Sequence, residues 1–477
     1  MRIGQTSIVY SISRFAGSAL GFVATIYFAR ELGDTVLGQF ALILALVMWV
    51  GIASQVGLSE SITKRISEGS ESEEYFGAGL VFTGGVTVLA TLVILVFGDV
   101  VNSYVGTSAV LLVIPLLALI TLKSILNAAL HGRRLVHLES LLQVGGEAVK
   151  SATQIALVAV GWGLSGMVTG YAVSSLLTAI VALWMIDVRP AAPRREHFVS
   201  LFEFAKYSWL GNLSQRFYGS LDVTVLGVFV ASGLVGVYSV VWSIVVFLTI
   251  FGNGIQTTIF PEMSKQSAHE NTDAVVGLTE DALRYSGLVL IPGFVGAIIV
   301  GDRVLRIYGP TFTRGTEVFG ILAMAAIIWT FNKQLVNAFN AIDRPDIAFR
   351  SNSVFVVANT ILNVVLIYQF SIVGAAVATM LSSGIALLTS AHYARSWFDI
   401  DPPYGEITRQ CLSALVMGGV VLAARTVLAS YFSGNNLVFV VVLVSIGVGV
   451  YFTVLSAISR DFRTTLSQNI PSNPITG

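Results

Sequence analysis

The sequence has little charge and almost no cysteine. Charged residues make up only 11% of the 477 residues, whereas hydrophobic residues reach 55% and the mean hydropathy is +0.80. Soluble domains carry about 25% charged residues, so these values exclude a soluble protein and indicate a chain that crosses a membrane many times. The single cysteine, Cys411, cannot form an internal disulfide or a cysteine metal cluster, and we expect no metal site.

Other absences exclude further classes of protein. The 27 basic and 27 acidic residues balance, and no arginine-rich surface segment points to nucleic acid. Membrane glycosyltransferases and polymerases usually place paired carboxylates on an outer loop, but Asp302 and Glu317 are isolated from each other. We therefore expect no enzymatic activity, no catalytic residue and no cofactor. The basic residues at mid-membrane, described below, argue against a scaffold without transport activity, because such a protein would not need them.

Apolar runs of about 20 residues, enough to cross a ~30 Å hydrocarbon core, recur along the chain. They predict an all-α polytopic membrane protein with about 14 transmembrane helices. The expected helices lie at 5–29, 38–62, 76–98, 108–131, 137–160, 164–186, 204–230, 234–258, 285–301, 316–340, 350–370, 373–394, 405–429 and 435–459. The expected domains are a six-helix lobe at 1–186, a cytoplasmic linker at 187–203, a pseudo-symmetric six-helix lobe at 204–394, a helix pair within 405–460, and a cytoplasmic tail at 461–477.

The loops differ in their content of Lys and Arg, which is retained on the cytoplasmic side. The odd-numbered loops, together with the helix ends that flank them, hold only Arg30, Arg303, Arg306, Arg314 and Arg425. The N-terminus, the tail and the even-numbered loops hold the larger share. We therefore expect both termini to lie in the cytoplasm.

The two sets of six expected helices carry matching motifs in the same order. The matches are R-F-x-G-S at 14–18 and 216–220, Gly-x-aromatic at 38–40 and 236–238, Lys, Asn, Ala and Arg at one spacing within 123–134 and 333–344, and Ser-Ser at 174–175 and 382–383. Because each set has an even number of helices, both enter from the same side of the membrane. Transporters built from such repeats hold their substrate between the halves.

Five basic residues fall deep inside expected spans, where a central Lys or Arg costs roughly 2.5–3.5 kcal/mol on insertion scales. Arg14 and Arg216 match in the repeat, as do Lys123 and Lys333, and Lys150 is the fifth. Such residues normally face a bundle interior or a water-filled cavity. We therefore predict that these five residues bind an anionic head group.

Polar side chains on the same helices recur at three- and four-residue spacing and predict the rest of the cavity lining. The expected lining residues are Ser11, Ser18, Gln143, Glu147, Gln154, Asn212, Gln215, Tyr218, Asp222, Asn337, Asn359 and Asn363. Setting these five basic residues against Glu139, Glu147 and Asp222 leaves two positive charges. A phosphate or diphosphate would neutralise them, and arginine binds phosphate oxygens in a bidentate manner.

Structural roles remain an alternative for the lysines. Lys123 and Lys333 lie near helix ends, where a long side chain can snorkel to the membrane surface. Lys150 can instead pair with Glu147 at three-residue spacing on one helix face.

The assembled features resemble the multidrug/oligosaccharidyl-lipid/polysaccharide exporter superfamily, and its polysaccharide-biosynthesis flippase branch in particular. The resemblance spans nearly the whole chain and is carried by Ala29-Arg30-Glu31-Leu32-Gly33 with Gly38-Gln39-Phe40, by Gly57-Leu58 with Ile62-Thr63-Lys64-Arg65, and by Val235-Gly236-Val237-Tyr238. It implies two six-helix lobes around a central cationic cavity that opens alternately to each side.

The resemblance further implies a flippase for a dolichyl- or undecaprenyl-phosphate-linked oligosaccharide, moved to the outer face of the cell membrane. The implied partners are this lipid-linked oligosaccharide, membrane lipids, a coupling cation, glycosyltransferases and an oligosaccharyltransferase. Arg14 and Arg216 resemble arginines of the superfamily's lipid II flippases. The acidic cluster at 68–74 resembles those of halophilic archaeal proteins, which would imply N-glycosylation of a surface-layer glycoprotein. The alternative is a drug or cation antiporter of the same superfamily, for which Asp222 would bind the cation unless it pairs with an arginine.

Overall fold

The computed structural model describes residues 3–55, 57–398, 400–432 and 434–469, and these residues contain helices and connecting turns but no strand. The all-α expectation is therefore confirmed for this part of the chain. The side chains of residues 3–19, 52–55, 136–137, 206–217 and 465–469 lie outside the described residues.

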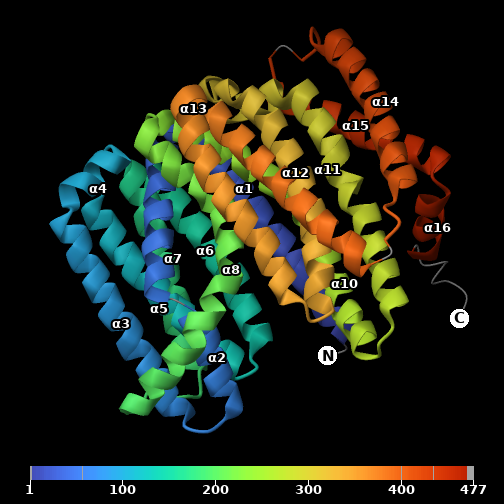
Figure 1. Cartoon of the computed structure of the whole chain (residues 1–477). Helices are drawn as coiled ribbons and strands as arrows, with labels where there is room; N and C mark the ends of the chain where they lie inside the picture. The colour runs from blue at the N-terminus through green and yellow to red at the C-terminus, as the bar shows by residue number, and fades with distance from the viewer. Residues whose placement is uncertain (1–2, 56, 399, 433, 470–477) are drawn as a thin grey trace, which may run out of the picture. The chain divides into compact units, whose positions relative to one another are not determined.

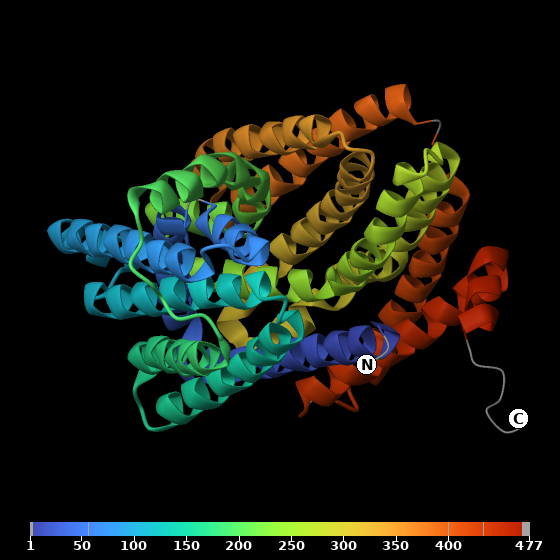
Figure 2. The same cartoon turned by 90° about the horizontal axis from the view of Figure 1, so that it is seen from below.

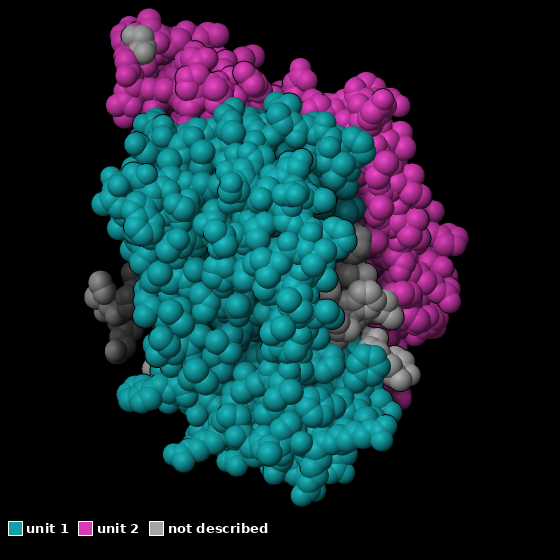
Figure 3. All heavy atoms as spheres, turned by 90° about the vertical axis from the view of Figure 1, so that its left-hand side faces the viewer, with its two compact units in different colours: residues 1–239 teal, residues 240–477 magenta. Residues whose placement is uncertain are grey.

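The chain divides into two compact units, Met1–Ser239 and Val240–Gly477, which are coloured separately in Figure 3. The first unit holds α1 (Ile3–Gln55), α2 (Leu58–Glu68), α3 (Ser72–Val96), α4 (Gly98–Val105), α5 (Val110–Gly132), α6 (Val136–Ala159), α7 (Gly163–Met185) and α8 (Arg195–Phe229). The boundary falls within α9 (Ser232–Leu248). The second unit holds α10 (Ile250–Ala268), α11 (Thr272–Tyr308), the 3-10 helix η1 (Pro310–Gly315), α12 (Thr316–Ala341), α13 (Pro345–Trp397), α14 (Tyr404–Leu428), α15 (Asn436–Ile458) and α16 (Arg460–Asn469) (Figure 1).

Nine helices among the described residues are long and apolar enough to cross a membrane, or ten if α9 and α10, which meet at a 44° bend, form one span. Two of the nine, α1 and α13, have 53 residues each. At 1.5 Å per residue one straight helix of this length would extend roughly 80 Å, more than twice the thickness of a hydrocarbon core, but neither α1 nor α13 is straight. Each is interrupted once, by Gly33 with φ 77° and by Ser371 with φ 55°.

These interruptions lie where the sequence predicts loops between consecutive spans. Each of these elements therefore consists of two consecutive helices that meet at a kink of one residue instead of a loop. Helix α6 is long enough to be a span but carries Glu139, Glu147 and Lys150, which lower its apolar character. The total of about 14 crossings and the expected lobes stay predictions.

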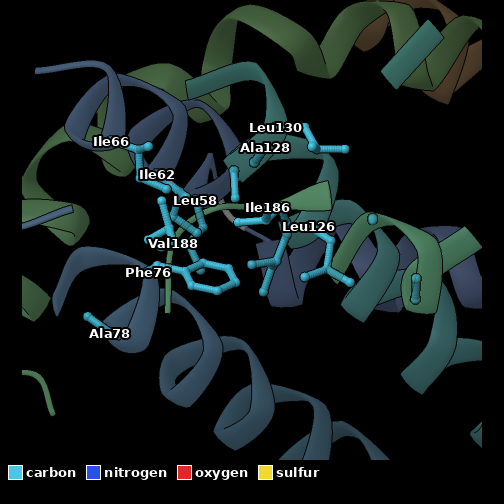
Figure 4. Close-up of a cluster of buried hydrophobic side chains, with 14 of the residues drawn as sticks. Leu58, Ile62, Ile66, Phe76, Ala78, Leu126, Ala128, Leu130, Ile186 and Val188 are labelled. Atoms are coloured by element: carbon cyan, nitrogen blue, oxygen red, sulfur yellow. The ribbon is translucent and has the colours of Figure 1, made fainter. Parts of the chain in front are cut away.

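A hydrophobic cluster fixes the short helix α2 within the first unit. Leu58, Ile62 and Ile66 recur at four-residue spacing on one face of α2 and are almost fully buried. They belong to the same cluster as Phe76 of α3 and Leu126 of α5, as Figure 4 shows. Helix α5 packs in turn against α3 and α7, and α6 packs against α7 (Figure 2).

The final helix pair belongs to the core of the second unit. Helices α14 and α15 pack against each other and against α11. Their shared cluster includes Ile291 of α11, Met417 of α14 and Leu443 of α15, which all have exposed fractions of 6% or less. Helix α11 and the final helix pair therefore share one hydrophobic core.

Helices α1 and α9 cross at two glycines, Gly38 and Gly236, that match in the internal repeat. A Cβ atom on Gly38 would overlap the carbonyl oxygen of Ser232, and one on Gly236 would overlap the carbonyl oxygen of Asp34. On each helix the glycine follows the overlapping residue by four positions, so that both lie on one face. Small residues at such spacing allow helix backbones to approach closely in membranes.

We expect Gly38→Val to lower the melting temperature of the purified protein sharply. Overpacking of side chains typically costs about 1–3 kcal/mol, and here the added atoms meet backbone that cannot rotate away. Gly84→Val is the matched control, because Gly84 lies in α3 with open space beside it. Similar melting temperatures for the two variants in detergent would contradict the close crossing.

Candidate functional site

Helices α5, α6 and α7 bring three charged side chains together in the first unit. Lys150 Nζ donates to Glu147 Oε2, which confirms the pair expected from their spacing. The same ammonium lies 5.0 Å from the centre of the Tyr171 ring on α7, in a cation–π contact. Lys123 on α5 is close enough for its charge to interact with both Glu147 and Lys150.

This cluster holds more positive than negative charge. Two lysines and Glu147 leave one positive charge, and no described carboxylate lies within ion-pair distance of Lys123. The nearby Glu139 does not compensate it fully, because it is the weakest of the three charges that act on the Lys123 ammonium. An ionisable group at membrane depth that lacks full compensation marks a functional site.

Small residues set the distance between the helices at this cluster. A Cβ on Gly146 of α6 would lie 2.9 Å from Thr178 Oγ1 and 3.8 Å from Lys123 Nζ. Ser174 Oγ donates to the Gly146 carbonyl at 2.6 Å and joins α7 to α6. Gly146 therefore allows close packing of α7 and leaves the space beside the Lys123 ammonium unfilled by its own side chain.

The repeat-related lysine of the second unit has a neutral partner. Lys333 Nζ on α12 donates to Asn253 Oδ1 on α10 at 3.1 Å. One turn further, Asn337 is buried, and its amide nitrogen has no hydrogen-bond partner among the described residues. In the first unit Asn127, one turn after Lys123, likewise has a buried amide oxygen without a described partner. Each half therefore presents a lysine and an asparagine with unused hydrogen-bonding capacity on one helix face.

Two of the predicted lining residues lie inside a hydrogen-bond network. Asn359, on the first part of α13, donates to Thr379 Oγ1 at 3.2 Å and to Ser382 Oγ at 3.1 Å on the second part. Asn363 donates to Asn359 Oδ1 at 3.1 Å. Both asparagines are fully buried, so they join the two parts of α13. Their role in lining a cavity stays a prediction.

The other described lining residues have varied surroundings. Gln143 is exposed. Gln154 is buried and donates to the Met167 carbonyl at 2.7 Å, which ties α6 to α7. Asp222 of α8 is 3% exposed and accepts a hydrogen bond from the Tyr238 hydroxyl of α9.

The remaining predicted residues belong to parts of α1 and α8 whose side chains lie outside the described residues. They are Arg14, Arg216, Ser11, Ser18, Asn212 and Gln215. Tyr218, the first described residue after this part of α8, is half-buried. Neither the role of the two arginines nor their pairing with Asp222 is tested by the described side chains.

Sequence reasoning missed two partners of the lysines. Tyr171 lies one turn before the repeated Ser-Ser motif. Spacing along one helix does not predict its contact with Lys150, because that residue lies on another helix. Asn253 follows the 44° bend between α9 and α10, and no motif marks it. Among the described residues, no group of three or more His, Cys, Asp or Glu side chains is arranged to hold a metal ion.

Comparison with known proteins identifies the family. The model for the family described as "Polysaccharide biosynthesis protein" matches residues 3–267, more than half of the chain. The chain belongs to this family. The assignment confirms the resemblance seen in the short motifs after the first and second expected helices and at the start of the eighth.

This member of the polysaccharide biosynthesis family has two full-length relatives in Haloferax volcanii. It is 30% identical over 454 residues to the "Probable flippase AglR", covering 94% of each chain. It is 29% identical over 471 residues to the "Probable low-salt glycan biosynthesis flippase Agl15", covering 98% of this chain and 99% of that one.

Solved structures of related transporters share the fold of this family member. The lipid II flippase MurJ, in an inward closed conformation, aligns with a TM-score of 0.81 and 15% identity over 96% of this chain and all of that one. An inward-facing multidrug resistance MATE family transporter aligns with a TM-score of 0.64 and 15% identity, over 81% of this chain and 98% of that one. At these identities the likeness establishes the fold alone.

The pair of Lys150 and Glu147 generates a prediction about stability. Because the pair is partly buried, Lys150→Met and Glu147→Leu should each lower the melting temperature, while the double variant should recover most of the loss. We expect a coupling energy of about 1 kcal/mol, within the range for residues in contact. Thermal unfolding of the four proteins in detergent measures it.

The control pair is Glu262 and Lys265 of α10, which have the same three-residue spacing but are largely exposed. Exposed pairs contribute little, so the corresponding cycle should give a coupling near zero. Equal coupling for the two pairs would contradict a special stabilisation at Lys150.

Proposed function

We propose that this protein is a flippase that moves a phosphate- or diphosphate-linked isoprenoid oligosaccharide from the cytoplasmic to the outer face of the plasma membrane. The observation that carries the proposal is the one excess positive charge of the cluster formed by Lys123, Glu147 and Lys150 on helices α5 and α6. Cations at membrane depth favour an anionic substrate, and lysine binds phosphate as a concentrated point charge. The names of the Haloferax relatives, both called flippases, support the same function.

We infer that α1 and α13 each cross the membrane twice, with the turns at Gly33 and Ser371. Together with α3, α5, α6, α7, α8, the bent pair α9 and α10, α11, α12, α14 and α15, this gives about 14 crossings of ~20 residues. The distribution of Lys and Arg favours cytoplasmic termini. In this proposal the six-helix lobes at 1–186 and 204–394 alternate access around a cavity that contains Arg14 and Arg216.

The substrate in this proposal carries a dolichyl- or undecaprenyl-type lipid and a saccharide. Asn127 and Asn337, each with an unused buried amide atom, suit sugar hydroxyls, which both donate and accept hydrogen bonds. Glycosyltransferases would supply the substrate, and an oligosaccharyltransferase or a polysaccharide assembly system would consume it. Transport needs no covalent step by the protein, so we propose no enzymatic activity.

A drug or cation antiporter of the same superfamily is the second candidate. The observation that favours it is Asp222, a buried carboxylate hydrogen-bonded to Tyr238. A buried carboxylate can bind a transported or coupling cation. The shared fold with a MATE transporter is consistent with this alternative.

Lys123→Gln and Lys333→Gln should each reduce glycan export by about 10- to 100-fold, because a hydrogen bond to a charged group contributes about 1.5–3 kcal/mol. Arg14→Ala and Arg216→Ala should abolish export. The measurement uses a strain that lacks its own copy of the gene and expresses each variant. Mass spectrometry of its lipid-linked saccharides then detects substrate retained at the inner leaflet, alongside glycosylation of surface protein.

Lys265→Gln is the matched control, since Lys265 is exposed near the end of α10 and should leave export unchanged. Normal surface glycosylation in the Lys123, Lys333, Arg14 and Arg216 variants, at normal protein levels, would refute the anion site. Protection of cells against cationic drugs, without any glycan phenotype in the deletion strain, would establish the antiporter instead.

A further inference from the structure

Three helix ends of the second unit meet at a cluster of arginines. Arg425 of α14 donates to Asp302 Oδ2 of α11 at 2.9 Å and also to the Ile299 carbonyl. Arg303 forms an ion pair with the same carboxylate oxygen, and its Nε atom lies 3.8 Å from Asp302 Oδ2. Asn436, the first residue of α15, donates to the Arg303 carbonyl at 2.8 Å. Two guanidinium groups therefore compete for one carboxylate.

The cluster has excess positive charge and unused hydrogen-bonding groups. The two chain segments that form it, 302–317 and 425–436, contain four arginines and two acidic residues, namely Arg303, Arg306, Arg314, Arg425, Asp302 and Glu317. Arg303 Nε and Asn436 Oδ1 are buried and have no hydrogen-bond partner among the described residues. Four arginines against two carboxylates leave two positive charges in these segments, which an anionic ligand would balance.

The cluster lies at the end of membrane spans and beside an apolar surface. The candidate spans α11 and α14 end here, at Tyr308 and Leu428, and the span α15 begins at Asn436. Exposed apolar side chains continue from this end along α14 and α15, including Val427 and Val441. Phosphate groups of a bilayer lie at the ends of spans, and its acyl chains lie against such surfaces.

We propose that Arg303, Arg306 and Arg425 bind the phosphate of an anionic membrane phospholipid whose acyl chains lie along α14 and α15. Arg306 is exposed one turn after Arg303, and guanidinium groups match phosphate oxygens in geometry and charge. Asp302 positions Arg425 without neutralising the cluster. The phospholipid ties the end of α11 to the final helix pair, whether or not the protein transports a saccharide.

The test is native mass spectrometry of the full-length protein in detergent, titrated with phosphatidylglycerol. The protein should retain one phosphatidylglycerol tightly. The double variant Arg303→Gln, Arg306→Gln should bind it at least about tenfold more weakly, a change of 1.4 kcal/mol. Arg395→Gln is the matched control, because Arg395 is an exposed arginine near the end of α13 in the same unit and should bind like wild type.

Unchanged phosphatidylglycerol binding in the double variant would overturn the site. Retention of a lipid-linked saccharide instead of phosphatidylglycerol, lost in the same variant, would overturn the assignment of the occupant. If the double variant does not fold, the single variant Arg306→Gln replaces it, since its exposed side chain makes no described ion pair. Export of glycan is measured separately, so that failure of the lipid site and failure of the flippase proposal are distinguishable.

Discussion

Hydrocarbon offers no hydrogen bonds, and this constraint governs what the chain can build. Every backbone polar group in a span must be satisfied within the protein, which explains why the described residues form helices. The same constraint acts on side chains. Lys150 pairs with Glu147, Asn359 contacts hydroxyls from the other part of α13, and Gln154 donates to a neighbouring helix. Polar groups left without a partner are therefore the informative exceptions.

Close approach of the helices is the second requirement if polar groups are to find partners within the protein. Gly38 and Gly236 permit the crossing of α1 and α9, and Gly146 permits α7 to approach α6 beside Lys123. The first two glycines match in the internal repeat, so helices at equivalent positions of the repeat contact each other directly. Packing between small residues, more than burial of large apolar ones, stabilises helix association in lipid.

The two matched lysines differ in their surroundings despite their matched sequence. Lys123 belongs to a charged cluster with Glu147 and Lys150, whereas Lys333 donates to the neutral Asn253. What they share is an asparagine one turn later with an unused amide atom. The two halves therefore present the same lysine and asparagine on one helix face, while the residues that contact each lysine differ.

Hydropathy, composition and spacing along one helix are properties of the sequence, and they determined the all-α class, the Lys150–Glu147 pair and the matched Lys and Asn positions. Contacts between helices depend on which faces pack together, and only the tertiary structure decided them. Tyr171 beside Lys150, Asn253 beside Lys333 and the burial of Asn359 are of this kind. The same holds for Gly33 and Ser371, where a single non-helical residue replaces the expected loop between two helices. Periodicity marks a polar face but does not specify the neighbour that will cover it.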